Sequence, residues 1–129
     1  LHLSLRRQRQ MCIRDSLQME GREVFRYAVS CMGDAATTIM SQNGFTGDDL
    51  ALFISHQANI RIIQAIAKRL NVPDEKVFIN LDKYGNTSAA SIPIALNEAR
   101  KSGRIKSGDL VLMVAFGAGF TWASSLVRM

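Results

Sequence analysis

The sequence predicts a single α/β domain built on a mixed sheet with helices packed on it. Two kinds of apolar pattern alternate along the chain: long stretches with helical spacing, and short apolar runs typical of strands. The run at 110 to 116 has no polar residue, which is typical of a strand covered on both faces. The glycine-containing link GAG joins it to a final strand pattern, as in a hairpin. The expected element order is therefore α-β-α-β-α-β-β.

The first helix is predicted over residues 21 to 42, because apolar residues recur there with helical spacing and Asn43-Gly44 then ends it. The apolar residues of this stripe are Val24, Phe25, Ala28, Val29, Met32, Ala36, Ile39 and Met40. After the loop FTGDD, the sequence ALFIS predicts a strand at 51 to 55. The stretch ANIRIIQAIAKRL predicts a second helix, which NVPD stops. The apolar face of this second helix consists of Ile63, Ile66, Ala67 and Leu70.

The rest of the chain continues the alternation. The sequence KVFINL predicts a strand at 76 to 81, and the loop DKYGN follows it. A third helix is expected from Thr87 to about Lys101, because Ser102-Gly103 ends the pattern there. The apolar run DLVLMVAF at 109 to 116 and the sequence FTWASSLVRM predict the two strands of the hairpin.

Composition limits the classes of protein. A chain of 129 residues, 47% hydrophobic and 21% charged, forms one globular domain at most. No apolar run approaches the roughly 18 residues that a membrane span needs, and the arginine-containing N-terminus has no signal-peptide apolar segment behind it. Cys12 and Cys31 lie in no CxxC or zinc-type spacing, so we expect a reducing cytoplasmic setting, no metal site and no membrane contact.

The net charge of +5 is concentrated at the N-terminus. Of the 16 basic and 11 acidic residues, four arginines and one aspartate fall in residues 1 to 16, so the rest of the chain is only mildly basic. This segment has neither helical nor strand periodicity, and we expect a disordered or artefactual tail. A basic arm that contacts nucleic acid is the functional alternative.

Two polar side chains stand where a predicted strand gives way to a predicted helix. His56 follows the apolar run ALFI, and Asn86 follows VFINL and a glycine. In α/β sheets the carboxyl ends of strands are where ligands bind, so the two positions are candidates for chemistry. The simpler interpretations are a helix cap or core histidine at His56, and turn chemistry or a helix cap at Asn86.

Three motifs carry a resemblance to a known family. SHQANIRI, KYGNTSAAS and AFGAGFTWASSLVRM, in this order and at this spacing, closely resemble the C-terminal half of β-ketoacyl-acyl-carrier-protein synthase III, a condensing enzyme of the thiolase superfamily. The resemblance runs over residues 17 to 129 and implies a thiolase-like half-domain there. It fails over residues 1 to 16, and the N-terminal half that the family implies is absent from the sequence.

The resemblance implies a decarboxylative Claisen condensation in fatty acid biosynthesis. The family's nucleophilic cysteine would belong to the missing half, while the histidine and asparagine of its triad fall on His56 and Asn86. Loss of carbon dioxide from a malonyl thioester leaves negative charge on the thioester oxygen, and two preorganised N–H donors stabilise that charge. A neutral imidazole suits this task, and we expect the positive end of the following helix to keep His56 neutral.

The resemblance also implies positions that contact the substrates. Phe116 and the backbone N–H of Ala118 would belong to the active-site loop and its oxyanion hole, although Phe116 is equally compatible with a core role. Gly21, Phe25 and Asn59 would approach coenzyme A and its pantetheine arm; Asn59 alone is also explained as a polar residue of a first helical turn.

Basic residues of the second predicted helix are candidates for partner binding. Arg61 and Lys68 lie two turns apart and share a face, with Arg69 at its edge. A solvated polar face is the simpler explanation, whereas the resemblance implies docking of the acidic acyl carrier protein. Cys31 lies on an apolar helical stripe, where we expect it to be buried and unreactive.

The sequence therefore predicts the C-terminal half of an acyltransferase that uses a coenzyme A thioester and a phosphopantetheinyl carrier as substrates and needs no further cofactor. The implied partners are acyl carrier protein, acyl-coenzyme A, the missing N-terminal half and a second subunit in a homodimer. The alternatives are a related synthase of secondary metabolism, a non-catalytic remnant or carrier-binding module, and a small basic nucleic-acid protein. We expect the chain alone to be inactive, because it lacks the family's cysteine.

Overall fold

A computed structural model describes residues 20–129. The predicted tail at residues 1 to 16, with Cys12, lies outside the described residues. The helices are α2 (Gly21–Gln42), α3 (Ile60–Arg69), α4 (Leu81–Tyr84) and α5 (Ser91–Lys101). The strands are β1 (Leu52–Ser55), β2 (Val77–Phe78), β3 (Leu110–Gly117) and β4 (Thr121–Arg128). Short 3-10 turns occupy Gly47–Asp49, Asp74–Lys76 and Ser88–Ala90.

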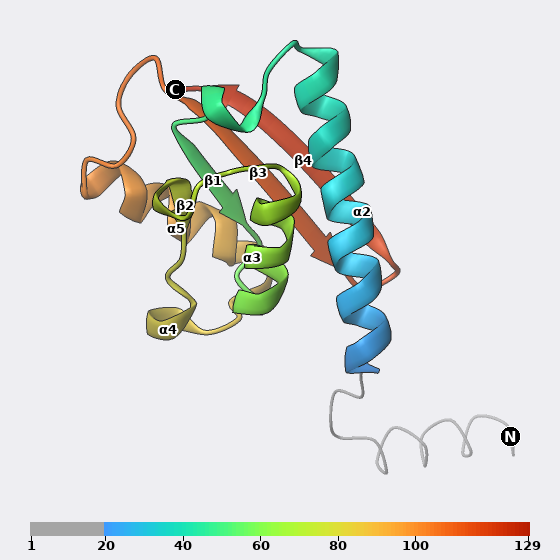
Figure 1. Ribbon diagram of the computed structural model, residues 1–129. Coiled ribbons are helices and arrows are strands. Elements are labelled where there is room, and N and C mark those ends of the chain that lie inside the picture. The colour runs from blue at the N-terminus through green and yellow to red at the C-terminus, as the bar shows by residue number, and fades with distance from the viewer. Residues whose placement is uncertain (1–19) are drawn as a thin grey trace, which may run out of the picture.

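The four strands form one mixed sheet in the order β2-β1-β3-β4. β1 lies parallel to both β2 and β3, whereas β3 and β4 form an antiparallel hairpin. Helices α2 and α3 cover one face of the sheet and α5 covers the other (Figure 1). This arrangement confirms the predicted mixed α/β architecture and the hairpin at the C-terminal end.

The buried side chains recur with helical spacing on α3 and lie on both faces of β3. The apolar face predicted for the second helix is confirmed, because Ile63 and Ile66 are fully buried. On β3, Leu112 packs into the core under α2 and α3 and Val111 into the core under α5. The prediction of a strand covered on both faces is therefore correct for the first part of β3.

The stripe predicted for the first helix is only partly buried. Ala28, Met32, Ala36 and Met40 lie in the core, whereas Phe25, near the start of α2, is 37% exposed. Cys31 is half-buried, so the expectation that it is buried is wrong. None of the helices between residues 20 and 129 combines the length and apolar character that a membrane-spanning helix needs.

The predicted strand at 76 to 81 is wrong in its extent. Only Val77–Phe78 pair with β1, and α4 (Leu81–Tyr84) takes the place of the last expected strand residue and the start of the expected loop. The strand ends early because Asn80 is buried and its polar groups bond outside the sheet. Its backbone N–H donates to Gln57 Oε1 at 3.0 Å, and its Nδ2 donates to Glu98 Oε2 at 2.8 Å.

Gln57 is a buried polar residue that follows β1, as Asn80 follows β2. Its side chain is 1% exposed, and Nε2 donates to the carbonyls of Ser55 at 2.9 Å and Phe78 at 3.1 Å. One carboxamide thus joins the carboxyl ends of β1 and β2 through three hydrogen bonds, counting the one it accepts from Asn80. Because both ends of the buried Gln57 carboxamide are hydrogen-bonded, the two corners that follow these strands are joined to each other.

Replacement of Gln57 by methionine keeps its length and removes the three hydrogen bonds. The buried Asn80 N–H and the two strand-end carbonyls then lose this partner, so we expect the free energy of unfolding to fall by about 3 kcal/mol. Urea titration of the variant measures the loss. Gln64→Met is the matched control, because Gln64 is exposed on α3, and it should change stability by no more than about 0.5 kcal/mol. Equal effects of the two substitutions would remove the structural role from Gln57.

Candidate active site

His56 lies in the corner between β1 and α3, directly after the last residue of β1. Its backbone N–H donates to the carbonyl of Val114 on the neighbouring strand β3 at 2.8 Å, which fixes the start of the corner. Its ring is half-buried, and Nδ1 lies 2.7 Å from the Ser91 hydroxyl at the first residue of α5. The other ring nitrogen, Nε2, has no hydrogen-bond partner within residues 20–129. One edge of the imidazole is therefore engaged by the protein, and the other is free for a ligand.

Burial lowers the pKa of His56 below its ordinary value, because removal from water disfavours the charged imidazolium. The neutral state expected from the sequence is thus confirmed in direction. Burial is the cause of this lowering, whereas the expected contribution of the helix end stays a prediction, since α3 begins only at Ile60, behind its N-cap Asn59. A neutral imidazole can still donate a hydrogen bond through one of its nitrogens.

Asn86 lies in the turn between α4 and α5 and is exposed. Its Oδ1 accepts a hydrogen bond from the backbone N–H of Ser88 at 3.0 Å, and Gly85 precedes it with φ +65°. This is the turn chemistry that the sequence suggested as the simpler interpretation. Because Oδ1 is held by the turn, the Nδ2 group is the part of the carboxamide left to donate.

The structure brings both corners to the beginning of α5. His56 contacts Ser91, the first residue of that helix, and Asn86 lies in the turn that leads into it. No hydrogen bond joins His56 to Asn86 within the described part of the chain. The sequence analysis did not single out Ser91 as a site residue, although it is the last residue of the quoted motif KYGNTSAAS. Its role depends on a contact 35 positions away in the chain, which periodicity alone does not reveal.

A charged pair supports the loop that carries Asn86. Lys83, on α4, pairs with Glu98 on α5, and Glu98 also accepts the hydrogen bond from Asn80. The hydrogen bonds from Lys83 and Asn80 lower the pKa of Glu98, and the Glu98 carboxylate raises the pKa of Lys83. Both shifts favour the charged forms, so the pair joins the two helices on either side of the Asn86 turn.

The hairpin turn between β3 and β4 carries an aromatic row. The Phe116 ring lies 5.0 Å from that of Phe120, and the Phe120 ring lies 5.4 Å from that of Tyr27 on α2. Phe116 also packs against the core under α2 and α3, in agreement with the core role left open for it. Ala118 is exposed in the turn, and its carbonyl accepts a hydrogen bond from the Thr121 hydroxyl at 3.3 Å.

The three residues expected near coenzyme A are all exposed. Gly21 and Phe25 lie in the first turns of α2. Asn59 is the N-cap of α3, where its Oδ1 accepts from the Arg61 backbone N–H at 2.9 Å. This capping bond explains Asn59 without a ligand. Its Nδ2 group is not needed for the cap.

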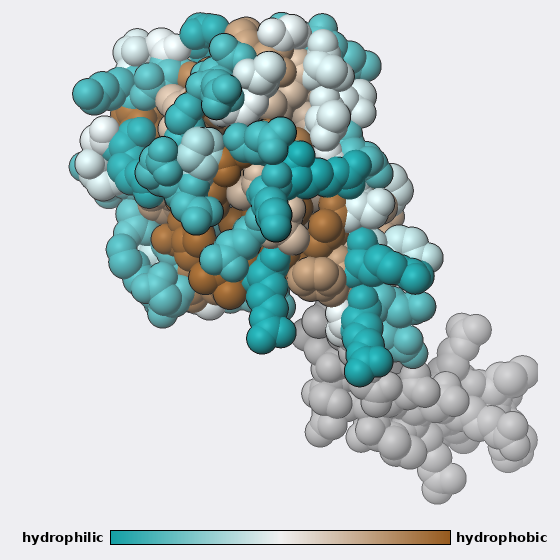
Figure 2. Space-filling view, viewed as in Figure 1, coloured by the Kyte–Doolittle hydropathy of each residue, from teal (hydrophilic) through white to brown (hydrophobic). Residues whose placement is uncertain are grey.

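Apolar side chains reach the surface around these positions. Figure 2 shows them gathered between α3 and α4, and again between α3 and α2. The large apolar and aromatic side chains that are exposed are Phe25, Tyr27, Ile60, Tyr84, Phe120 and Trp122. No cluster of His, Cys, Asp or Glu able to hold a metal ion occurs among residues 20–129.

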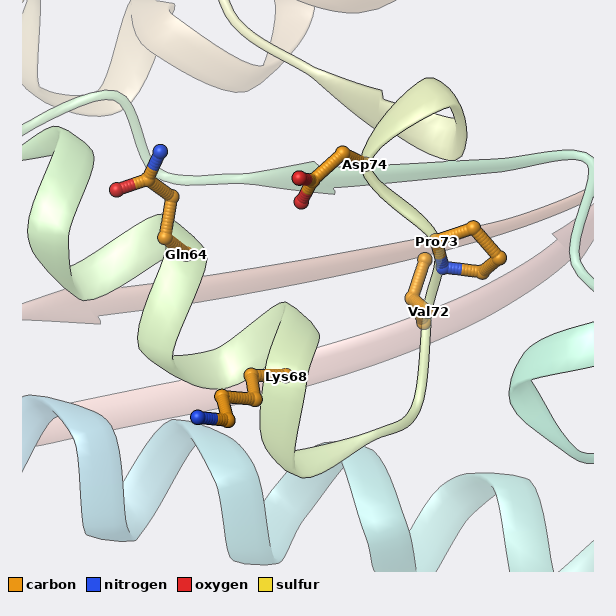
Figure 3. A pocket seen from close by; sticks show the side chains of 5 residues that line it. All are labelled: Gln64, Lys68, Val72, Pro73 and Asp74. Carbon is orange, nitrogen blue, oxygen red and sulfur yellow. The ribbon is translucent and has the colours of Figure 1, made fainter.

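The three basic residues of α3 differ in their surroundings. Arg69 pairs with Asp34 on α2 and also donates to the Ser30 carbonyl, so it joins the two helices. Arg61 and Lys68 are exposed, and neither takes part in an ion pair within residues 20–129. Lys68 also borders a shallow hollow of about 440 Å³ (Figure 3). Its other lining residues are Gln64, Val72, Pro73 and Asp74.

The family model and the similar proteins of known sequence point to the same family. Residues 40–129 match the family model described as 3-oxoacyl-[acyl-carrier-protein (ACP)] synthase III C terminal. Over 110 residues, the chain is 56% identical to β-ketoacyl-[acyl-carrier-protein] synthase III of Caldanaerobacter subterraneus subsp. tengcongensis. That alignment covers 85% of this chain and 33% of the relative, so the chain spans about a third of the length of the curated relatives it matches.

Solved structures agree with the sequence comparison. The crystal structure of 3-oxoacyl-[acyl-carrier-protein] synthase III from Aquifex aeolicus matches with a TM-score of 0.85 and 53% identity, covering 87% of this chain and 36% of that one. The priming β-ketosynthase from the R1128 polyketide biosynthetic pathway matches with a TM-score of 0.80 and 40% identity, covering 88% and 34%. Since the family model covers most of the chain and the fold agrees, the chain belongs to the 3-oxoacyl-[acyl-carrier-protein] synthase III family and corresponds to its C-terminal part.

Proposed function

We propose that this chain supplies the decarboxylation half of a condensing site, in a protein that joins an acyl group from acyl-coenzyme A to malonyl-acyl carrier protein in fatty acid biosynthesis. The observation that carries the proposal is the His56 corner. Burial keeps the imidazole neutral there, Nδ1 is engaged by Ser91, and Nε2 is left free at the carboxyl end of a sheet strand. Asn86 supplies a second neutral donor from the neighbouring corner.

The proposed reaction places these donors on the malonyl thioester oxygen. The bond between the malonyl α-carbon and its carboxylate breaks, carbon dioxide leaves, and the electron pair moves into the thioester carbonyl as an enolate. His56 and Asn86 stabilise that oxyanion, which carries more charge in the transition state than in the substrate. The enolate carbon then attacks the acyl group on a cysteine, and the cysteine thiolate leaves.

We propose that this cysteine lies in a part of the protein outside the present sequence. The relatives are about three times as long as the matched region. Cys31 is half-buried on α2, in an element that contributes neither His56 nor Asn86. The backbone N–H of Ala118 and the Phe116 side chain would complete the pocket around the acyl group. Gly21, Phe25 and Asn59 would line the approach of the pantetheine arm.

A related condensing enzyme of secondary metabolism is the second candidate. The likeness to a priming β-ketosynthase of a polyketide pathway supports it, since the two chains share 40% identity over most of this one. Higher identity to synthases of the fatty acid type, 53% and 56%, favours the first candidate. In both cases the proposed setting is the reducing cytoplasm, the proposed assembly is a homodimer, and the thioester substrates need no separate cofactor.

The first test uses a chimeric synthase, in which residues 20–129 replace the matching part of the Aquifex aeolicus enzyme. His56→Ala and Asn86→Ala should each slow decarboxylation of malonyl-acyl carrier protein at least a hundredfold, because one lost oxyanion donor costs on the order of 3 kcal/mol. Transfer of the acyl group to the cysteine should change little. The two half-reactions are followed with labelled carbon dioxide and labelled acyl-coenzyme A, and Asn97→Ala, at an exposed asparagine of α5, serves as the control. Normal decarboxylation in either variant would remove that residue from the mechanism.

A second test addresses carrier binding. In the same chimera, Arg61→Glu together with Lys68→Glu should raise KM for malonyl-acyl carrier protein on the order of tenfold, and KM for acyl-coenzyme A much less. Added salt should weaken carrier binding by the unsubstituted chimera, because exposed charges are screened. Arg69→Glu is the internal comparison: loss of its pairing with Asp34 should lower stability by on the order of 0.5 kcal/mol, since both side chains are largely exposed. An equal rise of both KM values would argue against docking.

The proposed neutral state of His56 also predicts a pH dependence of stability. Its pKa is lowered in the folded protein, so between that pKa and the unfolded value of about 6.5 the unfolded chain binds more protons. The free energy of unfolding should therefore fall as the pH drops from 7 toward 5. Urea titrations in a His2→Gln background, where His56 is the only histidine, measure this slope. His56→Gln should flatten it, and an unchanged slope would contradict the neutral imidazole.

A further inference from the structure

Ser91 occupies an unusual place for a hydroxyl group. It is the first residue of α5 and is 2% exposed, among side chains that pack against the sheet. Its Oγ lies 2.7 Å from His56 Nδ1, and the backbone N–H of Gln57 donates to the same oxygen at 3.4 Å. A single buried hydroxyl is thus in contact with the candidate catalytic ring and with the residue that joins the two strand ends.

The donors and acceptors at this oxygen decide the direction of the bond to His56. A hydroxyl has one proton to donate and two lone pairs that accept. Gln57 N–H uses one lone pair. If Nδ1 carried a proton and used the other, the hydroxyl proton would be left without an acceptor among the contacts that residues 20–129 provide. An unpaired buried hydroxyl is costly, whereas donation to a bare Nδ1 pairs every group.

From this geometry we infer that Ser91 is a positioning residue: its hydroxyl donates to His56 Nδ1 and thereby holds the imidazole in the tautomer that carries its proton on Nε2. The inference rests on the proposed function, because that tautomer directs an N–H donor from the free edge of the ring toward the malonyl thioester oxygen. The other tautomer would present a lone pair to the developing negative charge and repel it.

The surrounding packing makes the contact rigid. Ala95 and Ala99, on the same helix as Ser91, are fully buried in the core on that face of the sheet. Gln57 holds the other side of the contact through its bonds to both strand ends. The ring and the hydroxyl are therefore fixed by separate elements that meet at this point, and neither can turn without loss of a buried hydrogen bond.

The tautomer is measured directly by nitrogen NMR of the 129-residue chain labelled at the imidazole nitrogens. The sequence has two histidines, so the His2→Gln variant leaves the signals of His56 alone. We expect a pyrrole-type Nε2 and a pyridine-type Nδ1. Ser91→Ala should move the two nitrogen shifts toward each other as both tautomers become populated. Ser91→Thr, which keeps the hydroxyl, should restore the separation. A protonated Nδ1 in the unsubstituted chain, or an unchanged pattern in Ser91→Ala, would overturn the inference.

A kinetic readout in the chimeric synthase tests the consequence for catalysis. Ser91→Ala should lower kcat for decarboxylation on the order of tenfold to a hundredfold with little change in KM, since the ring is misdirected while carrier binding is untouched. Ser91→Thr should recover most of the rate. Should the alanine variant unfold, Ser91→Cys keeps the volume with a weaker donor and is measured in its place. A chimera without decarboxylation would defeat the proposed function and leave the NMR result standing. Full activity of the Ser91→Ala variant, or of Ser91→Cys where the alanine variant unfolds, would defeat the role of Ser91.

Discussion

The position of the candidate site depends on one buried carboxamide. Gln57 joins the end of β1 to the end of β2, and its own backbone N–H reaches the first residue of α5. Three segments that are distant in the sequence therefore meet around a side chain that is almost fully removed from water. A buried amide of this kind is stabilising only when all its partners are in place, so the corner forms as a unit.

The same burial determines the chemistry that is available. A carboxamide connection brings no charge into the corner, and burial lowers the pKa of the half-buried imidazole next to it. The charged side chains of Lys83 and Glu98 lie outside this corner and pair with each other nearer the surface. The donors proposed to face the substrate are thus neutral, and such donors favour a transition state in which charge develops on the thioester oxygen over a ground state in which that oxygen is uncharged.

Local periodicity predicted most of the fold. For the site, it predicted only that His56 and Asn86 follow strands, not the contacts that they make. The long stripe of α2, the apolar face of α3 and the hairpin depend on spacing within one element, and all three are present in the structure. The strand at 76 to 81 was predicted too long because Asn80 pairs with Gln57 and Glu98, which are far away in the chain. For the same reason the contact between Ser91 and His56 could not be predicted from either corner alone.

The basic residues of α3 show why residue type and spacing cannot separate a structural cation from one available to a partner. Arg61, Lys68 and Arg69 all lie on exposed parts of the same helix. Arg69 is engaged by Asp34 and the Ser30 carbonyl of α2, and Gly33 leaves room for it, since a Cβ there would come within 2.8 Å of Nη1. The charge of Arg69 is therefore partly neutralised by α2. Arg61 and Lys68 make no ion pair within residues 20–129, so the proposed acidic partner would be attracted to the part of α3 that α2 does not neutralise.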